Sequence, residues 1–265
     1  MKDYIDKETQ QFLLIFAGLC IFLYFIFPRI DTYLFALDFG QPIAPLFPEI
    51  SNSKSLGSPS DFTLVENKDY SASVSTNLGD FKIDLFEKSA PKNVANFVSL
   101  TSFYTNSNIT VENNYLFKAD SNTSVKYTLN DEINADYLLL DRIKVKDATF
   151  LRDAYDPKDS NTKAFAPDNL RKYEDFTLKQ FYSEILGYKY DASLSTPRAV
   201  RYTVYMTNTG PNTNKANFFV VMAGTAPEID GRYTPIGRVT DGFTTVDKIN
   251  SAQGAGVKIN SVKVN

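Results

Sequence analysis

The stretch from Thr207 to Val239 reads "TNTGPNTNKANFFVVMAGTAPEIDGRYTPIGRV" and holds two apolar runs among turns dense in Asn, Gly and Pro. The first run, Phe218 to Val221, follows directly on the most polar turn. Short apolar runs bounded by turn residues are typical of buried β-strands. The stretch therefore predicts a β-barrel that carries a groove on its outer face.

Similar runs recur before and after this stretch. Two alternating runs in Tyr70–Phe86 surround the turn sequence Asn77-Leu78-Gly79-Asp80, which predicts a β-hairpin. Further strands are predicted at Tyr115–Ala119, Tyr202–Met206, Phe218–Ala223, Thr234–Val239 and Val257–Val264. Many short strands with few helices predict a mainly β fold, a closed antiparallel barrel with capping helices.

Two helices are expected to cap this barrel. The first begins with Ser89 as the predicted N-cap and with Pro91 in its first turn. Its apolar face comprises Val94, Phe97, Val98 and Thr101, at the spacing of a helix. Phe243–Ile249 is the second, shorter candidate.

The segment from about 134 to 197 does not follow the strand-rich pattern. It is charged, and it contains one clear helix, which Gly187 is placed to end. The apolar face of this helix comprises Leu178, Phe181, Tyr182 and Ile185. We interpret the segment as a helical insertion that packs on the barrel. It is either a solvated subdomain of no special function or a partner-binding surface.

The amino terminus contains an unbroken apolar run of about sixteen residues, Phe12–Phe27, which Pro28 and Arg29 end. Its length lies between that of a signal-peptide core, about 7–15 residues, and that of a spanning helix, about 17–25. No small-residue cleavage pattern follows it, so an uncleaved transmembrane helix within residues 1–30 is favoured over a cleaved signal. A buried soluble helix is disfavoured because the run has no polar face.

Residues 31–65 are predicted to be a Pro-rich linker, and residues 66–265 to be the folded domain with its insertion. Lys2 and Lys7 precede the apolar run, whereas Arg29 follows it. This distribution slightly favours a cytoplasmic amino terminus. The expected location is therefore a membrane, crossed once, with the domain outside the cytoplasm.

Composition removes several classes of function. The 265-residue chain has no His and one Cys, which excludes a Ser-His-Asp triad, a His- or Cys-based zinc site and an internal disulfide. A net charge of -3 argues against a nucleic-acid-binding surface. Asp131 and Glu132 resemble a turn or strand edge, with no base or nucleophile near them in a known pattern, so a hydrolase or metal enzyme is disfavoured. Neither a metal nor a cofactor is expected.

Three segments, "GPNTNKANFF", "AGTAPEIDGRYTPIGRV" and "DGFTTVDKI", closely resemble the cyclophilin-type peptidyl-prolyl isomerases. The earlier stretch "VSTNLGDFKIDLFEKSAPKNVANFVSLTSFY" resembles the first hairpin and first helix of that family, in the same order. The resemblance covers about Tyr70 to Asn265, apart from the insertion. It implies a cyclophilin-like barrel that isomerises prolyl peptide bonds in proline-containing polypeptides without a cofactor.

The resemblance also implies which apolar residues bind substrate. Phe219, Ile229 and Leu116 would form the walls of a pocket for the proline ring. Met206 would lie under the same floor, and Tyr115 would take the place of an aromatic wall residue. Phe219 and Met206 could instead be plain core residues.

Polar substrate contacts are implied in the same way. Asn208, with the backbone of Thr207 and Thr209, would hold the substrate main chain. Asn217 would add a side-chain amide, and Tyr233 would offer a hydroxyl where the family often has a histidine. Asn208 and Asn217 could instead be turn or strand-end residues.

The family's catalytic arginine has no counterpart in this chain. Members typically carry Phe-His-Arg shortly before Phe-Met-x-Gln-Gly-Gly-Asp, whereas the matching stretch "NITVENNYLFKADS", 108–121, contains neither Arg nor His. Thr110 or a neighbour occupies the place of the arginine, and Lys118 stands about where the glutamine would be. Lys118 is a candidate for the missing cation, although it lacks the planar fork of arginine. Otherwise it is a charge at the edge of the groove.

Two functions are consistent with this combination of family-like segments and an altered 108–121 stretch. The first is a membrane-anchored prolyl isomerase that assists protein folding at the membrane. The second is a catalytically weak or inactive module that binds peptides or serves as a structural subunit. The well-kept "GPNTN" to "GRV" half of the groove favours the first, and the altered half that should carry the cation favours the second.

Overall fold

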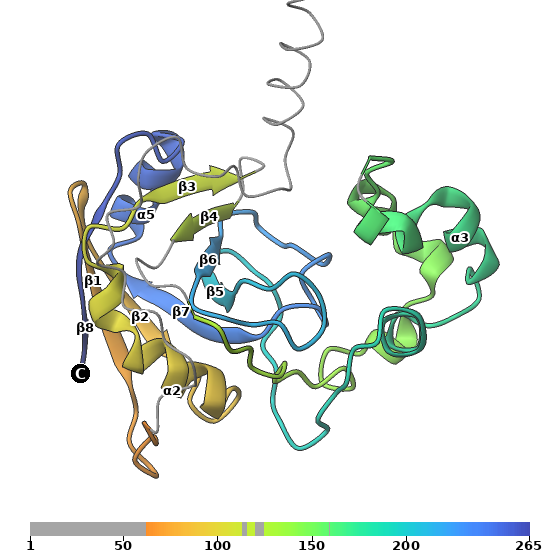
Figure 1. Ribbon diagram of the computed structural model, residues 1–265, viewed down its shortest axis with the longest axis horizontal. Coiled ribbons are helices and arrows are strands. Elements are labelled where there is room, and N and C mark those ends of the chain that lie inside the picture. Colours follow the sequence, from red (N-terminus) through yellow and green to blue (C-terminus); the bar gives the residue numbers. More distant parts are fainter. Residues whose placement is uncertain (1–61, 113–115, 120–124, 159) are drawn as a thin grey trace, which may run out of the picture. The chain divides into compact units, whose positions relative to one another are not determined.

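The computed structural model describes residues 62–112, 116–119, 125–158 and 160–265 (Figure 1). Its strands are β1 (Ser71–Thr76), β2 (Gly79–Leu85), β3 (Ile109–Glu112), β4 (Leu116–Ala119), β5 (Thr203–Met206), β6 (Phe218–Val221), β7 (Pro235–Asp241) and β8 (Ile259–Val264). Its helices are α2 (Pro91–Ser99), α3 (Pro167–Lys172), α4 (Leu178–Gln180) and α5 (Phe243–Ser251). Short 3₁₀ turns span Thr101–Tyr104, Leu140–Arg142, Val145–Asp147, Thr149–Ala154 and Ser160–Phe165, and a π-helical turn spans Phe181–Ile185. The predicted mainly β fold is confirmed.

The strands form one antiparallel sheet in the order β3-β4-β6-β5-β7-β2-β1-β8. β1 and β2 are the predicted hairpin, in which Thr76 pairs with Gly79 across the turn. The sheet is curled, and its two ends are joined by backbone hydrogen bonds. The Asn106 amide donates to the Ile259 carbonyl at 2.7 Å, and the Ile259 amide donates to the Ser107 carbonyl at 2.9 Å.

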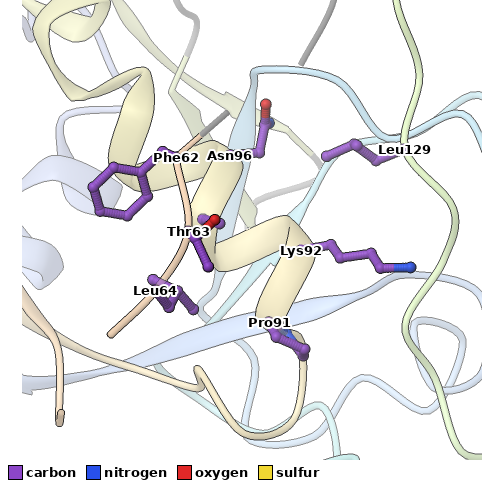
Figure 2. A pocket seen from close by; sticks show the side chains of 8 residues that line it. Phe62, Thr63, Leu64, Pro91, Lys92, Asn96 and Leu129 are labelled. Carbon is purple, nitrogen blue, oxygen red and sulfur yellow. The ribbon is translucent and has the colours of Figure 1, made fainter. Parts of the chain in front are cut away.

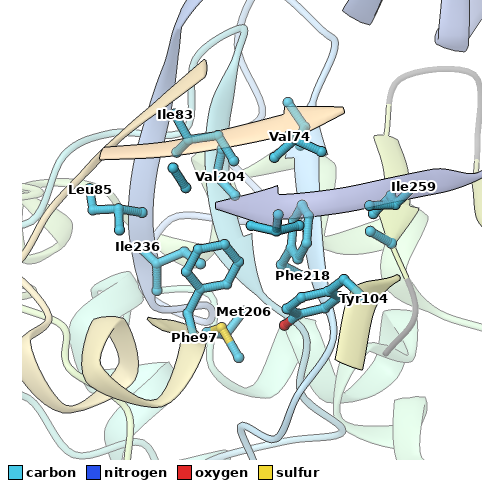
Figure 3. Packing of buried hydrophobic residues seen from close by; sticks show 14 of the residues in the cluster. Val74, Ile83, Leu85, Phe97, Tyr104, Val204, Met206, Phe218, Ile236 and Ile259 are labelled. Carbon is cyan, nitrogen blue, oxygen red and sulfur yellow. The ribbon is translucent and has the colours of Figure 1, made fainter. Parts of the chain in front are cut away.

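One face of the sheet covers the main hydrophobic core. Phe218 of β6 packs edge-to-face on Phe97 of α2, with ring centroids 5.5 Å apart, and on Tyr104 at 5.3 Å. Met206 of β5 is fully buried in the same cluster, and Figure 3 shows it beside Phe97. Val94 and Phe97 are both buried, as the predicted apolar face of this helix requires. The core therefore lies where α2 meets the inner side of β5 and β6.

The insertion has a hydrophobic cluster of its own. Its predicted helix is present as α4 and the π-helical turn that follows. Thr177 and Gln180 form a capping box at its start, and Gly187, with φ of +84°, comes directly after its end. The buried side chains of this helix are Leu178, Phe181 and Tyr182.

The predicted membrane helix in residues 1–30 and most of the predicted linker in residues 31–65 lie outside the described residues. Among the helices that the structure does describe, none has the length and apolar character needed to cross a membrane. The division of the chain into anchor, linker and domain stays a prediction.

The amino end of α2 differs from the expectation. Its N-cap is Ala90 instead of Ser89, and Ala90 has no side-chain group that could accept a hydrogen bond. The Glu132 carboxylate accepts the hydrogen bonds of this helix end instead. It accepts from the amides of Lys92 at 3.1 Å and Asn93 at 2.8 Å, and from the Asn93 side chain at 2.9 Å. A carboxylate at this end also interacts favourably with the helix dipole.

The neighbouring Asp131 holds the "GPNTN" turn. Its carboxylate accepts hydrogen bonds from the Asn212 amide at 2.7 Å and the Asn214 side chain at 3.0 Å. Asn214 also donates to the Thr234 hydroxyl at 3.1 Å. Burial raises the pKa of Asp131 to about 6, although these hydrogen bonds pull it lower. Asp131 and Glu132 lie in an irregular segment just after the bridge between Leu129 and Asn214, and both are buried, so their carboxylates anchor neighbouring backbone.

Replacing the remote cap should destabilise the domain. Glu132→Ala is expected to lower the free energy of unfolding by about 1–3 kcal/mol, because the buried amide and side chain of Asn93 lose their acceptor. Urea unfolding measures this difference. The exposed Glu184→Ala is the control and should stay within about 0.5 kcal/mol of wild type. Equal stabilities of the two variants would contradict the capping role.

The raised pKa of Asp131 makes stability depend on pH. The folded protein binds a proton that the unfolded chain releases between the ordinary pKa of 3.8 and about 6. The contribution of this group to stability therefore falls as pH rises through that window. Wild type should thus lose stability relative to Asp131→Asn between about pH 4.5 and about pH 7, measured by urea unfolding. The exposed Asp153→Asn is the control, and a difference for Asp131→Asn that does not vary with pH would refute the assignment.

Candidate functional site

The outer face of β5 and β6 carries a separate aromatic cluster. Because side chains alternate along a strand, Tyr205 and Phe219 point away from the main core. Their rings stack with centroids 5.5 Å apart and an interplanar angle of 14°, and Tyr233 packs edge-to-face on Phe219 at 5.3 Å. Ile229 belongs to the same cluster. Phe219 and Ile229 are each 5% exposed, so they form an apolar floor on this face.

A polar turn lies beside this floor and is held by its own side chains. Asn208 donates through its side-chain amide to the Arg232 carbonyl at 2.9 Å and to the Asn214 side chain at 3.3 Å. Its backbone amide has no acceptor among the described residues. The side chain therefore fixes the turn, while the backbone amide remains available to a ligand.

Tyr233 presents the second polar group of this face. Its side chain is partly exposed, and its hydroxyl makes no hydrogen bond to a described residue. Its ring packs on Phe219, and this contact fixes the position of the hydroxyl relative to the apolar floor. The arrangement places a donor and acceptor at the border of an apolar surface.

The strand register relates this face to Thr110, the position at which the family resemblance leads us to expect an arginine. Thr110 of β3 pairs with Lys118 of β4, Lys118 pairs with Phe219 of β6, and Phe219 pairs with Tyr205 of β5. Directly paired residues of antiparallel strands share one face of the sheet. Thr110 is exposed, whereas Val111 packs against the main core. Thr110 is therefore on the face that carries Phe219, and Val111 is on the other.

The structure separates one predicted pocket residue from the rest. Met206 is fully buried with Phe218 in the main core, on the face of the sheet opposite to Phe219, and its predicted place under the substrate floor stays a prediction. Leu116 pairs with Val221 of β6, next to the floor along the sheet. Tyr115 lies outside the described residues.

For Asn217, the structure describes a main-chain role. Its carbonyl accepts a hydrogen bond from the Thr207 amide at 2.9 Å, which joins the two ends of the polar turn. Thr209 closes the turn from within, because its amide donates to the Thr213 hydroxyl at 2.9 Å. For every residue that the sequence analysis assigned to substrate binding, contact with a substrate stays a prediction.

Sequence reasoning missed Tyr205, whose ring stacks on that of Phe219. Alternation within "TVYM" contains the necessary signal, because it separates Tyr205 from the buried Val204 and Met206 on either side. Pairing Tyr205 with Phe219 additionally requires the register between β5 and β6, which the sequence does not state.

A buried carboxylate anchors the loop that carries Ile229. Asp230 accepts a hydrogen bond from the Ala199 amide at 2.7 Å, and a guanidinium nitrogen of Arg198 lies 3.6 Å from its other oxygen. Burial raises the pKa of Asp230 to about 6, against the effect of these two partners. Both oxygens face groups of the fold itself, so Asp230 fixes the loop. Among the described residues, no three acidic, His or Cys side chains are grouped to hold a metal ion.

A cavity of about 460 Å³ lies elsewhere, between residues 62–64 and α2 (Figure 2). Its lining is Phe62, Thr63, Leu64, Pro91, Lys92, Ala95, Asn96 and Leu129. None of the residues expected to bind substrate lines it. The cavity is therefore distinct from the face of Phe219.

Known proteins resemble this chain over most of the described residues. Residues 71–264 match the family model described as cyclophilin type peptidyl-prolyl cis-trans isomerase/CLD. The mouse protein named peptidyl-prolyl cis-trans isomerase-like 3 is 27% identical over 179 residues, which cover 68% of this chain and 81% of that protein. Its chicken counterpart is 39% identical over 69 residues, 25% of this chain and 42% of that protein.

The shared stretch with the chicken and rat proteins of this name spans 42% of their length. A solved cyclophilin type peptidyl-prolyl cis-trans isomerase of Cryptosporidium parvum is 16% identical, with a TM-score of 0.46, over 75% of this chain and 98% of that one. The family model alone covers well over half of the 265 residues. The chain therefore belongs to the cyclophilin-type peptidyl-prolyl cis-trans isomerase family.

Proposed function

We propose that this chain catalyses cis–trans isomerisation of prolyl peptide bonds in proline-containing polypeptides, and so assists protein folding. Amide resonance sets a barrier of about 18–20 kcal/mol to this rotation. The reaction forms no covalent intermediate and needs no metal. An apolar surface for the proline ring, groups that hold the flanking main chain, and stabilisation of the twisted amide are sufficient.

The single observation that carries the proposal is the outer aromatic floor. Phe219 stacks on Tyr205, has Tyr233 packed edge-to-face on it and belongs to the same cluster as Ile229. An apolar surface of this kind suits a proline ring, because the ring is removed from water when it packs there. The Asn208 backbone amide and the Tyr233 hydroxyl lie at its border, where they would bind the main chain on either side of the proline.

The electrostatic component of catalysis is the altered part of this site. A cation that donates to the prolyl nitrogen favours the pyramidal transition state, and the family resemblance assigns that task to an arginine. Here Thr110 and Lys118 stand side by side across β3 and β4, in the row that contains Phe219. We propose that Lys118 supplies a weaker substitute and that turnover is correspondingly slow.

We further propose that residues 1–30 hold the domain at a membrane, outside the cytoplasm. The apolar run Phe12–Phe27 and the lysines that precede it support this location. Alkaline carbonate extraction of membranes provides the test. Release of the full chain into the soluble fraction would refute anchorage.

Removing the aromatic floor should abolish most activity. Phe219→Ala of the full chain is expected to reduce kcat/KM for a prolyl peptide at least about 10-fold, because a buried aromatic surface is lost. Relaxation of the cis peptide measures this rate. Tyr233→Phe, which keeps the ring and removes the hydroxyl, should cost less. Wild-type rates equal to buffer at high protein concentration would refute catalysis, and peptide binding without acceleration would favour the non-catalytic module.

Restoring the missing arginine should increase activity. Thr110→Arg is expected to raise kcat by about 10²-fold, the effect of one preorganised donor in an active site. Val111→Arg is the matched control, because the same side chain placed one residue later meets the main core and should destabilise the domain without a gain. A gain in Val111→Arg but not in Thr110→Arg would contradict the assigned register.

A further inference from the structure

Arg232 lies in the loop of the candidate site, yet its side chain is directed into the insertion. Its guanidinium is 4.9 Å from the ring centroid of Phe165, a buried residue of the insertion cluster, and 5.8 Å from that of Tyr233. Tyr188 of the same cluster is also beside it. Arg232 forms no ion pair with any described residue. This half-buried guanidinium thus lies between aromatic rings of the insertion and of the site, with Tyr188 as a hydrogen-bond partner.

The main chain of Arg232 is fixed at both of its polar groups. Its amide donates to the Ile229 carbonyl at 3.1 Å, and its carbonyl accepts from the Asn208 side chain at 2.9 Å. These bonds join the loop that carries Ile229 to the polar turn that carries Asn208. Arg232 therefore connects three parts of the molecule: the substrate loop, the polar turn and the insertion.

The preceding Gly231 shows how closely the insertion approaches this loop. Its φ is +81°, and a Cβ added there would overlap Leu140 of the insertion and lie 3.2 Å from the ring of Tyr182. The Tyr190 hydroxyl donates to the Gly231 carbonyl at 3.0 Å. The backbone of the loop is thus in direct contact with the insertion, and a side chain at position 231 would separate them.

We propose that the insertion is a brace for the substrate loop and that Arg232 is the positioning residue that couples them. The aromatic cluster of the insertion holds the guanidinium, and the guanidinium holds the ring of Tyr233 against Phe219. The proposal rests on the function proposed above for its effect on catalysis. Its structural part, a loop ordered by the insertion, stands independently of turnover.

This arrangement assigns a role to the insertion that neither sequence interpretation contained. A solvated subdomain would leave the loop unaffected when its cluster is disturbed. A surface for a separate partner would act only when that partner is present. A brace acts within the isolated chain, through one side chain, on Ile229 and Tyr233.

The test combines loop dynamics with kinetics in the full chain. Hydrogen exchange measured by mass spectrometry should be about 10-fold faster in residues 226–234 of Arg232→Leu, while the β1–β2 hairpin is unchanged. Phe165→Leu should have the same effect, and the double variant should be no worse than either single one. Arg232→Lys should restore part of the protection, because it keeps the charge but not the planar group.

Two matched controls separate positioning from general loss of stability. Arg238→Leu removes an exposed arginine from β7, and Phe150→Leu removes a partly buried ring of the insertion cluster that makes no cation–π contact with Arg232. Both should leave exchange in residues 226–234 as in wild type. Unchanged exchange in Arg232→Leu, or equal effects of Phe150→Leu and Phe165→Leu, would overturn the proposal.

Kinetics then connect the brace to the site. Arg232→Leu should lower kcat/KM by about 10-fold, mainly through KM, because Ile229 and Tyr233 would bind ground state and transition state alike. An altered exchange rate with unchanged KM would refute the link to substrate. If wild type shows no isomerase activity, the proposed function fails, whereas the exchange experiment still decides whether the insertion orders the loop.

Discussion

Side-chain alternation in β5 and β6 is the constraint on which the rest of this molecule depends. Phe218 and Met206 enter the core with Phe97. Their strand neighbours Phe219 and Tyr205 must therefore face outward. A shift of one residue in either strand would exchange the two sets and destroy core and site together. Core packing energy therefore also maintains the position of the outer aromatic floor.

Buried polar groups connect this floor to the rest of the fold. Asp131 anchors the turn that presents Asn208, Glu132 closes the amino end of α2, and Asp230 holds the loop that carries Ile229. Buried carboxylates are costly unless hydrogen bonds compensate them, and each of these has such partners. Each of these carboxylates accepts a hydrogen bond from a backbone amide and so fixes the backbone at that point. The backbone around the aromatic floor is thus held by hydrogen bonds within the fold itself.

The insertion extends this framework instead of standing apart from it. It has its own apolar cluster, but Gly231 and Arg232 bring the loop that carries Ile229 into contact with that cluster. Order in the apolar surface around Phe219 comes from the packing of its own side chains.

Local patterns in the sequence determined the β1–β2 hairpin, the apolar face of α2, the capped helix at Leu178 and its end at Gly187, because turn chemistry and periodicity act within a few residues. The absence of His likewise limited the chemistry without any structure. Only the tertiary structure decided that Glu132 caps a helix 39 residues away, that β3 is a strand beside β4, that Met206 and Phe219 lie on opposite faces, and that Arg232 enters the insertion. Each of these depends on which distant segments pair and in which register, and that choice is made by the packing of the whole domain.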